Sequence, residues 1–174
     1  MDITFCEKYI KITYNEAVAL FNHVSSTQGN VLELGRLWGG STRIICHAAK
    51  NRNVVSVDIK KRELKAFTEK DNFNNLRIIT ADSRYIKLED TFETVFIDVK
   101  PNIIHQNIFN VWNNITNYFI FHDYIKIKHI LDKFINRKKL KILSLTDDLL
   151  ITKKCFTSTG TKFKQRQEKI RRQY

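Results

Sequence analysis

The sequence is poor in the residues that interrupt or cross-link a chain. It contains five glycines, one proline and three cysteines among 174 residues. Cys6, Cys46 and Cys155 are odd in number and widely spaced, which excludes a disulfide framework and a zinc motif. Reduced thiols are typical of cytoplasmic proteins, so we expect that location.

Long hydrophobic runs are also missing. No apolar stretch approaches the roughly 20 residues of a membrane-spanning helix, and residues 1–8 lack the layout of a signal peptide. Hydrophobic residues nevertheless make up 43% of the chain, which is typical of globular proteins. We therefore expect one domain with a buried core and no membrane partner.

Acidic residues are few compared with basic ones. The chain has 30 Lys and Arg against 18 Asp and Glu, for a net charge of +12. More than half of this excess lies in residues 153–174, which hold eight Lys and Arg and one Glu. One interpretation is a tail that contacts nucleic acid or an acidic partner, and the other is a solvated tail. We divide the chain into a domain, residues 1–155, and a basic tail, residues 156–174, that we expect to be flexible.

Three of the few glycines lie together in residues 31–42. A short apolar run ends at Gly35, and Gly39 and Gly40 open a segment with helical spacing. A strand, a glycine turn and a helix form the opening of a nucleotide-type α/β site, where the helix N-terminus faces a ligand. A dinucleotide fingerprint needs glycine where this chain has Leu37, and the lysine of a Walker loop is missing. The turn therefore suits a ligand that has an adenosine but no phosphate.

Strand and helix patterns alternate along the rest of the chain. We predict parallel strands at residues 31–34, 53–58, 76–80, 94–98 and 118–121. Besides the helix after the glycine turn, we predict helices at residues 15–26 (with Asn15 as N-cap), 60–71, 102–116 (after Pro101) and 125–137. Two further strand-like segments, residues 140–145 and 149–152, flank Asp147 and Asp148 and predict an antiparallel hairpin at one edge of the sheet.

An acidic residue stands at or beside the end of every predicted parallel strand. These residues are Glu33, Asp58, Asp82, Asp98 and Asp123. The ends of parallel strands share one edge of a sheet, and the binding crevice lies outside that edge. Because acidic residues are scarce in this chain, their gathering predicts a site for a ligand that is cationic or rich in hydroxyl groups.

The segment Glu33-Leu-Gly35-x-x-x-Gly39-x-Ser41-Thr42 resembles the first motif of class I S-adenosylmethionine (SAM) dependent methyltransferases. It is most similar to the small O-methyltransferases that include catechol, macrocin and cephalosporin-pathway enzymes. Residues 96–102, Phe-Ile-Asp-Val-Lys-Pro-Asn, are similar to the family's Phe-Ile-Asp-Gly-Asp-His-Ser, and residues 119–124 end in its His-Asp-Tyr. The resemblance covers roughly residues 15–154. It implies a Rossmann-like α/β fold with seven strands in the order 3-2-1-4-5-7-6 and strand 7 antiparallel, and SAM as cofactor.

The resemblance also implies a set of cofactor-binding residues, namely Glu33, Gly35, Gly39, Ser41, Thr42, Asp58, Ile59, Asp82, Ser83 and Asp98. Asp58 stands 23 residues after Gly35, where an acid can accept both ribose hydroxyls. Ser41 and Thr42 would bind the cofactor carboxylate together with N–H groups of the helix start. Glu33 would face the amino acid end of the cofactor or orient the loop.

Three further residues concern the adenine and the glycine loop. Asp82 and Ser83 occupy the place that faces the adenine amino group in the family. Trp38, within the glycine loop, either covers the site or packs against the domain.

Methyl transfer to a hydroxyl group also requires removal of a proton by a base or a metal ion. The candidate catalytic residues are Asp98, Lys100, His122 and Asp123. In metal-dependent members, the positions of Asp98, His122 and Asp123 can hold Mg²⁺, usually with a carboxylate where His122 stands. Lys100 and Pro101 replace the family's Asp and His, so the chain departs from the family at an acid–base position.

The implied function is methyl transfer from SAM to a hydroxyl of a small molecule, such as a sugar or a phenol. Two alternatives stay open, namely methylation of RNA with the tail on the phosphates, and a non-catalytic nucleic-acid or assembly protein on the same scaffold. The chain has no inserted lid. Selection of the acceptor must therefore come from residues 1–14, 84–92 and 99–102, the basic tail or a second subunit.

Overall fold

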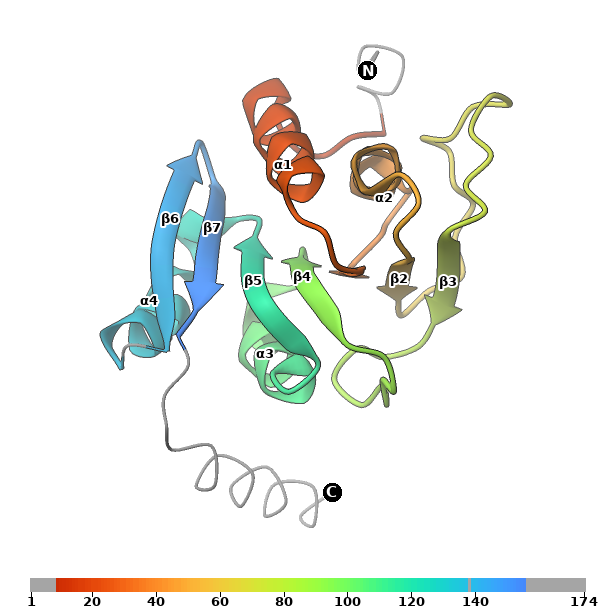
Figure 1. Cartoon of the computed structure of the whole chain (residues 1–174). Helices are drawn as coiled ribbons and strands as arrows, with labels where there is room; N and C mark the ends of the chain where they lie inside the picture. Colours follow the sequence, from red (N-terminus) through yellow and green to blue (C-terminus); the bar gives the residue numbers. More distant parts are fainter. Residues whose placement is uncertain (1–8, 138, 156–174) are drawn as a thin grey trace.

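The computed structural model describes residues 9–137 and 139–155, and its centre is a single seven-stranded sheet (Figure 1). The strands are β1 (Val31–Leu34), β2 (Val54–Asp58), β3 (Leu76–Thr80), β4 (Phe92–Ile97), β5 (Ile115–Phe121), β6 (Leu140–Thr146) and β7 (Leu149–Lys154). Their order is β3-β2-β1-β4-β5-β7-β6. Strands β1 to β5 pair in parallel, and β7 runs antiparallel to both β5 and β6. The predicted strand order and hairpin are confirmed.

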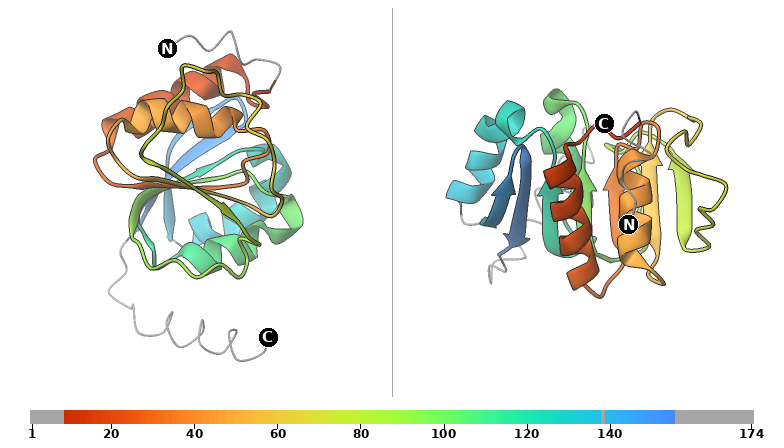
Figure 2. Two further views of the ribbon diagram at one scale, coloured as in Figure 1. Left: turned by 90° about the vertical axis from the view of Figure 1, so that its right-hand side faces the viewer. Right: turned by 90° about the horizontal axis from the view of Figure 1, so that it is seen from above.

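Helices cover both faces of the sheet. Helices α1 (Tyr14–Ser26) and α2 (Gly40–Ala49) lie over one face, and α3 (Ile104–Val111) and α4 (Tyr124–Asn136) lie over the other, as the edge-on view in Figure 2 shows. A short 3-10 helix, η2 (Pro101–Ile103), leads into α3 and begins at the proline, as predicted. Within the described residues, no helix has the length and hydrophobicity to cross a bilayer.

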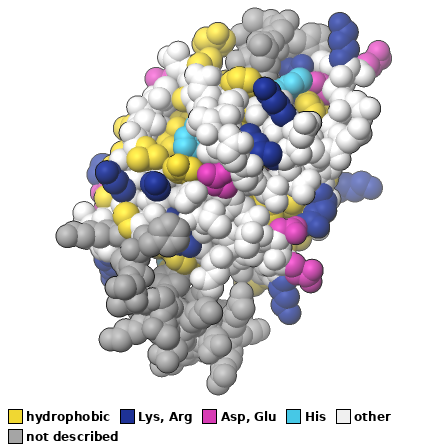
Figure 3. Space-filling model, in the orientation of Figure 1, with side chains coloured by type: hydrophobic (Ala, Val, Ile, Leu, Met, Phe, Trp, Pro, Cys, Tyr) yellow, Lys and Arg dark blue, Asp and Glu magenta, His cyan; other side chains and the backbone are white. Residues whose placement is uncertain are grey.

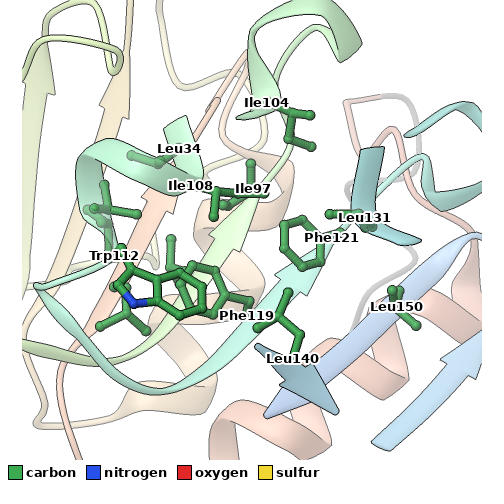
Figure 4. Packing of buried hydrophobic residues seen from close by; sticks show 14 of the residues in the cluster. Leu34, Ile97, Ile104, Ile108, Trp112, Phe119, Phe121, Leu131, Leu140 and Leu150 are labelled. Atoms are coloured by element: carbon green, nitrogen blue, oxygen red, sulfur yellow. The ribbon is translucent and has the colours of Figure 1, made fainter. Parts of the chain in front are cut away.

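The larger hydrophobic cluster fills the space between the sheet and helices α3 and α4 (Figure 4). Trp112 stacks on Phe119 with ring centroids 5.2 Å apart, and Phe119 in turn stacks on Phe121. The ammonium group of Lys154 lies 4.9 Å from the centre of the Trp112 ring and donates hydrogen bonds to the carbonyls of Trp112 and Ile115. Burial lowers the pKa of Lys154. The last strand is thus fastened to the aromatic core.

The helix predicted at residues 60–71 is not formed. This part of the chain consists of turns and irregular structure. The N–H of Ala66 donates to the carbonyl of Trp38 (3.1 Å) instead of to a carbonyl one turn earlier. The side chain of Leu64 packs so closely on Gly39 that a Cβ there would lie 2.9 Å from a Leu64 methyl. Contacts with the glycine loop therefore replace the helical hydrogen bonds.

The helix predicted at residues 102–116 is too long by several residues. Helix α3 ends at Val111, and Ile115, which lies within the predicted helix, is the first residue of β5 and is buried there. The Asn114 amide donates to the carbonyls of Leu88 and Asp90, at 2.9 Å each. These bonds fix a turn between helix and strand that hydrophobic spacing alone did not reveal.

Helix α1 is capped by Thr13 and not by Asn15 as predicted. The Thr13 hydroxyl accepts the N–H of Glu16, and the Glu16 carboxylate accepts the N–H of Thr13, which makes a capping box. The same residues reach the β6–β7 turn, because Thr13 donates to Asp147 (2.7 Å) and the N–H of Asp148 donates to Glu16 (2.9 Å). The start of the first helix is thereby tied to the last hairpin.

A buried carboxylate fastens the irregular segment to α2. Asp71, with 2% of its side chain exposed, accepts hydrogen bonds from Arg43 (2.7 Å) and from the N–H of Thr68 (2.7 Å), and lies 3.0 Å from the His47 ring nitrogen. Burial alone would raise the pKa of Asp71, but the donors of Thr68 and Arg43 outweigh it and hold the pKa below its usual value.

We predict that Asp71→Asn lowers the free energy of unfolding by about 2–3 kcal/mol, because the guanidinium group of Arg43 loses its charged partner in a largely buried place. Urea unfolding at neutral pH measures this change. Glu69→Gln is the matched control, since Glu69 is exposed in the same segment, and its effect should stay within about 0.5 kcal/mol. Equal effects of the two substitutions would contradict the proposed role of Asp71.

Candidate functional site

The glycine loop leaves the sheet where β1 ends, beside the end of β4. Gly35 has φ +91°, and a Cβ at this position would lie 1.9 Å from the carbonyl oxygen of Asp98. The N–H of Asp98 in turn donates to the Leu34 carbonyl (2.9 Å). Only glycine fits such a contact. The loops that follow β1 and β4 therefore touch at the carboxyl edge of the sheet.

Glu33 lies beneath this loop and is completely buried. Three hydroxyl groups donate to its carboxylate, namely those of Ser41 (2.6 Å), Thr42 (2.6 Å) and Ser56 (2.5 Å). Burial raises the pKa of Glu33, while the hydroxyl donors pull in the opposite direction without cancelling the rise. Of the two roles expected for Glu33, the geometry supports orientation of the loop and not contact with a ligand.

The same contacts correct the expectation for Ser41 and Thr42. Their hydroxyl groups point to Glu33 and are not available to a cofactor carboxylate. The first turn of α2 has no side-chain cap, however, and Gly39 at its N-cap has φ +85°. The backbone N–H groups of this first turn are left to bind an anion.

Asp58, at the end of β2, shapes the glycine loop. One oxygen accepts the N–H groups of Arg36 (3.0 Å) and Leu37 (2.9 Å), and the other accepts the N–H of Lys60 (2.8 Å). Burial alone would raise the pKa of Asp58, but these three donors hold it below its usual value. A carboxylate has about four acceptor positions. One position on Asp58 is therefore left for a ligand hydroxyl.

The first described residues lie across the start of α2. A Cβ on Gly40 would come within 2.8 Å of the backbone of Tyr9 and Ile10. Trp38 packs edge-to-face against Tyr9, with centroids 6.1 Å apart, and the Lys11 ammonium group lies 5.4 Å from the centre of the Trp38 ring. Of the two possibilities for Trp38, the contacts are those of packing.

The loop after β3 lies beside the loop after β2, because the N–H of Ala81 donates to the Asp58 carbonyl (3.0 Å). Arg84 donates to both carboxylate oxygens of Asp82, with a shortest distance of 2.6 Å, and keeps the pKa of Asp82 low. Ser83 is buried, whereas Ile59 is 62% exposed. Of the expected cofactor-binding residues in these two loops, Ile59 offers an open apolar surface and Asp82 is already paired.

Asp98, His122 and Asp123 come together at the ends of β4 and β5. The Nδ1 atom of His122 lies 3.2 Å from Asp98, close enough for an ion pair but not aligned as a hydrogen bond, and Nε2 lies 3.8 Å from Glu16. Burial would lower the pKa of His122, but Asp98, Asp123 and Glu16 together raise it above its ordinary value. Asp123 pairs with Lys126 at 2.9 Å.

Comparison with known proteins was made on both sequence and structure. No protein-family model matches the chain, and no curated protein matches it. Solved structures do match. The O-methyltransferase TomG from Streptomyces achromogenes, solved with SAM, has a TM-score of 0.70 and 10% identity over 85% of this chain and 82% of that one. An O-methyltransferase from Bacillus cereus, solved with S-adenosylhomocysteine (SAH), has a TM-score of 0.67 and 12% identity over 85% and 84%.

A third similar structure has a different acceptor chemistry. The N-methyltransferase NodS from Bradyrhizobium japonicum, also solved with SAH, has a TM-score of 0.60 and 13% identity over 80% of this chain and 86% of that one. This chain has the class I methyltransferase fold. At such identities the similarity establishes the fold, and the chemistry rests on the residues at the edge of the sheet.

Within this methyltransferase fold, the cluster of Asp98, His122 and Asp123 is the place for the expected Mg²⁺. Each residue can direct one ligand atom to a common point, with these atoms all within 4.8 Å of one another. Mg²⁺ prefers an octahedron of oxygen ligands. Here one donor is an imidazole whose raised pKa favours the protonated form, and Lys126 already neutralises Asp123. The donor set does not fit Mg²⁺.

Several residues of the site were not expected from the sequence. Arg36 is 2% exposed and donates to the carbonyl of Ser56 (2.9 Å) beneath the glycine loop. The sequence carried signals for two others. The spacing Thr13-x-x-Glu16 is that of a capping box, and Arg84 stands two residues after Asp82. Lys100, a predicted catalytic residue, is exposed, and its ammonium group makes no hydrogen bond or ion pair with any residue from 9 to 137 or 139 to 155.

We predict that the His122 ring titrates above 6.5, the value of an unperturbed histidine, and that Asp98→Asn lowers its pKa. The ion pair between protonated His122 and Asp98 then contributes its full stabilisation of the fold below pH 6.5. This stabilisation is lost as the pH rises through the folded-state pKa of His122. NMR titration of the ring protons measures both effects.

Two other histidines serve as internal controls for this titration. Burial lowers the pKa of His23 and of His105, so both rings should titrate below 6.5 and should not respond to Asp98→Asn. A His122 ring that titrates at or below 6.5 would overturn the assignment.

Proposed function

We propose that this protein is a SAM-dependent methyltransferase that transfers a methyl group to a hydroxyl. The observation that carries the proposal is the glycine loop, whose backbone is held by Asp58 and which ends at an uncapped helix. The proposal is also supported by known proteins, because structures with the same fold were solved with SAM or SAH.

The residues at this edge fit the cofactor at three points. The open acceptor position of Asp58 suits a ribose hydroxyl, and the first-turn N–H groups of α2 suit the cofactor carboxylate. The exposed side chain of Ile59 suits one face of the adenine. Binding of both ribose hydroxyls by Asp58 would require one of the backbone N–H groups of Arg36 and Leu37 to be released.

SAM supplies a methyl group activated on a sulfonium, so the protein has to position the acceptor and remove its proton. Asp98 is the accessible member of its cluster, with 31% of the side chain exposed against 11% for His122. The neighbouring carboxylates raise the pKa of His122 and so favour its protonated form. In the proposed reaction, the Asp98 carboxylate accepts the hydroxyl proton. The ring of His122, 3.2 Å from that carboxylate, holds it in position.

A hydroxyl acceptor is favoured over an amine by this arrangement. A hydroxyl must lose its proton to become an effective nucleophile, and Asp98 is the base available for it. Two of the similar structures are O-methyltransferases by name, and TomG is described as involved in tomaymycin synthesis. A hydroxyl acceptor has this support.

We predict that isothermal titration calorimetry detects SAH binding and that Asp58→Ala weakens it about tenfold or more, because both a ligand contact and the loop anchor are lost. Asp90→Ala is the matched control, since it removes the same charge at the opposite edge of the sheet. Equal affinities of the two variants would contradict the role of Asp58. A protein that binds neither SAM nor SAH would overturn the proposed function.

A further inference from the structure

The carboxylates at the carboxyl edge already have partners within the protein. Asp58 accepts three backbone N–H groups, and Asp82 is paired with Arg84. Asp98 faces His122, and Asp123 is paired with Lys126. Asp82 and Asp123 are therefore neutralised by cations, and Asp58 and Asp98 are already engaged within the protein.

Several lysines on the same edge have no such partner. The ammonium groups of Lys60, Lys61, Lys65 and Lys100, which we call the basic rim, make no ion pair or hydrogen bond with any described residue. All four residues are exposed. Glu63 is the single acid among them in residues 59–67, which also contain Arg62. In this segment the Lys and Arg side chains outnumber the acidic ones by four to one.

The basic rim and the loop after β3 extend over several strands. Residues 60–65 follow β2, Lys100 follows β4, and Arg84 follows β3. Neighbouring strands lie about 4.8 Å apart, so the row from β3 to β4 is roughly 14 Å long. This length exceeds a single phosphate group and suits a ligand that carries several.

Exposed apolar side chains gather along the same edge. Of the described large hydrophobic residues, four are more than 60% exposed, and they are Tyr14, Ile59, Tyr85 and Ile125. Ile59 and Tyr85 follow β2 and β3, while Tyr14 and Ile125 begin the helices tied to the β6–β7 turn. The guanidinium group of Arg84 lies 5.1 Å from the centre of the Tyr85 ring. An exposed ring on the same edge as lysines that have no partner among the described residues is a combination that single-stranded nucleic acids bind, with bases stacked on the ring and phosphates on the cations.

We propose that the methyl acceptor is a single-stranded nucleic acid whose phosphates lie on the basic rim and one of whose bases stacks on Tyr85. The proposal rests on the proposed function for the transfer step, but the binding itself does not depend on it. The net charge of +12 favours such a partner, and Lys and Arg side chains are spread over the face seen in Figure 3.

Fluorescence anisotropy with a labelled RNA of about 12 nucleotides tests the basic rim on the full chain. The triple variant Lys60→Ala, Lys61→Ala, Lys65→Ala should bind at least about tenfold more weakly at low salt. The slope of log affinity against log salt should fall by about 2, since each phosphate contact on a single strand contributes about 0.7. The control variant Lys128→Ala, Lys133→Ala, Lys141→Ala removes the same charge from exposed positions on α4 and β6. Equal affinities of the two triple variants would overturn the proposal.

Stacking on Tyr85 is tested separately. Tyr85→Ala should weaken RNA binding about tenfold with little change in the salt slope, because the ring contributes no charge. Tyr85→Phe keeps the ring and should restore the affinity. An alanine variant that binds as tightly as the unchanged protein would exclude the stacked base.

Competition distinguishes the source of the phosphates. Unlabelled RNA should displace the probe at far lower phosphate concentration than adenosine monophosphate or polyglutamate. Equal displacement by the mononucleotide would point to a small phosphorylated acceptor, and equal displacement by polyglutamate to an acidic protein, and either result overturns the proposal.

Titration of the same rim variant with SAH separates cofactor binding from RNA binding. If the variant binds SAH normally but loses RNA, both the proposed function and the basic rim are supported. If the unchanged protein binds SAH but not RNA, this inference fails and the proposed function survives. If it binds RNA but neither SAM nor SAH, the proposed function fails and the RNA-binding surface stands.

Discussion

The edge of the sheet depends on one buried carboxylate. Glu33 lies on the central strand, and the hydroxyls that donate to it come from β2 and from the first turn of α2. A charge in this position would be costly without those donors, and the nearby Arg36 compensates it further. Because these partners belong to different elements, the carboxylate fixes the start of α2 relative to the sheet. The glycine loop between them is thereby held in a strained conformation that includes Leu37 at φ +50°.

The charges at this edge form two layers with different tasks. Near the sheet, Asp58 and Asp98 organise backbone N–H groups and a histidine. Farther out, Lys60, Lys61 and Lys65 leave the sheet on an irregular segment and have no carboxylate partner among the described residues. The inner acids hold the glycine loop and His122, and in our proposal the outer lysines attract the acceptor. The same edge can therefore suit a cationic cofactor and an anionic acceptor at once.

Strand positions and their order could be predicted from the sequence because buried parallel strands read as short apolar runs. The alternation of strands and helices, together with the family motif around Gly35, was sufficient for the topology. The failures have a common cause, which is that long-range contacts decided the local structure. Leu64 and Ala66 bind the glycine loop instead of forming a helix, and Asn114 ends α3 through distant carbonyls. For the site, the sequence located the acids correctly but did not reveal the buried groups around them, since Ser56 and Arg36 carry no motif of their own.

The bond between Glu16 and the backbone of Asp148 joins residues 132 positions apart. Pairings of this range raise the contact order of a domain and slow its folding. The first helix also leaves the ribosome long before the hairpin that completes its cap has been made. During synthesis, α1 therefore has to wait for β7, and a chain released before that strand would expose the hydrophobic face that the two elements close together.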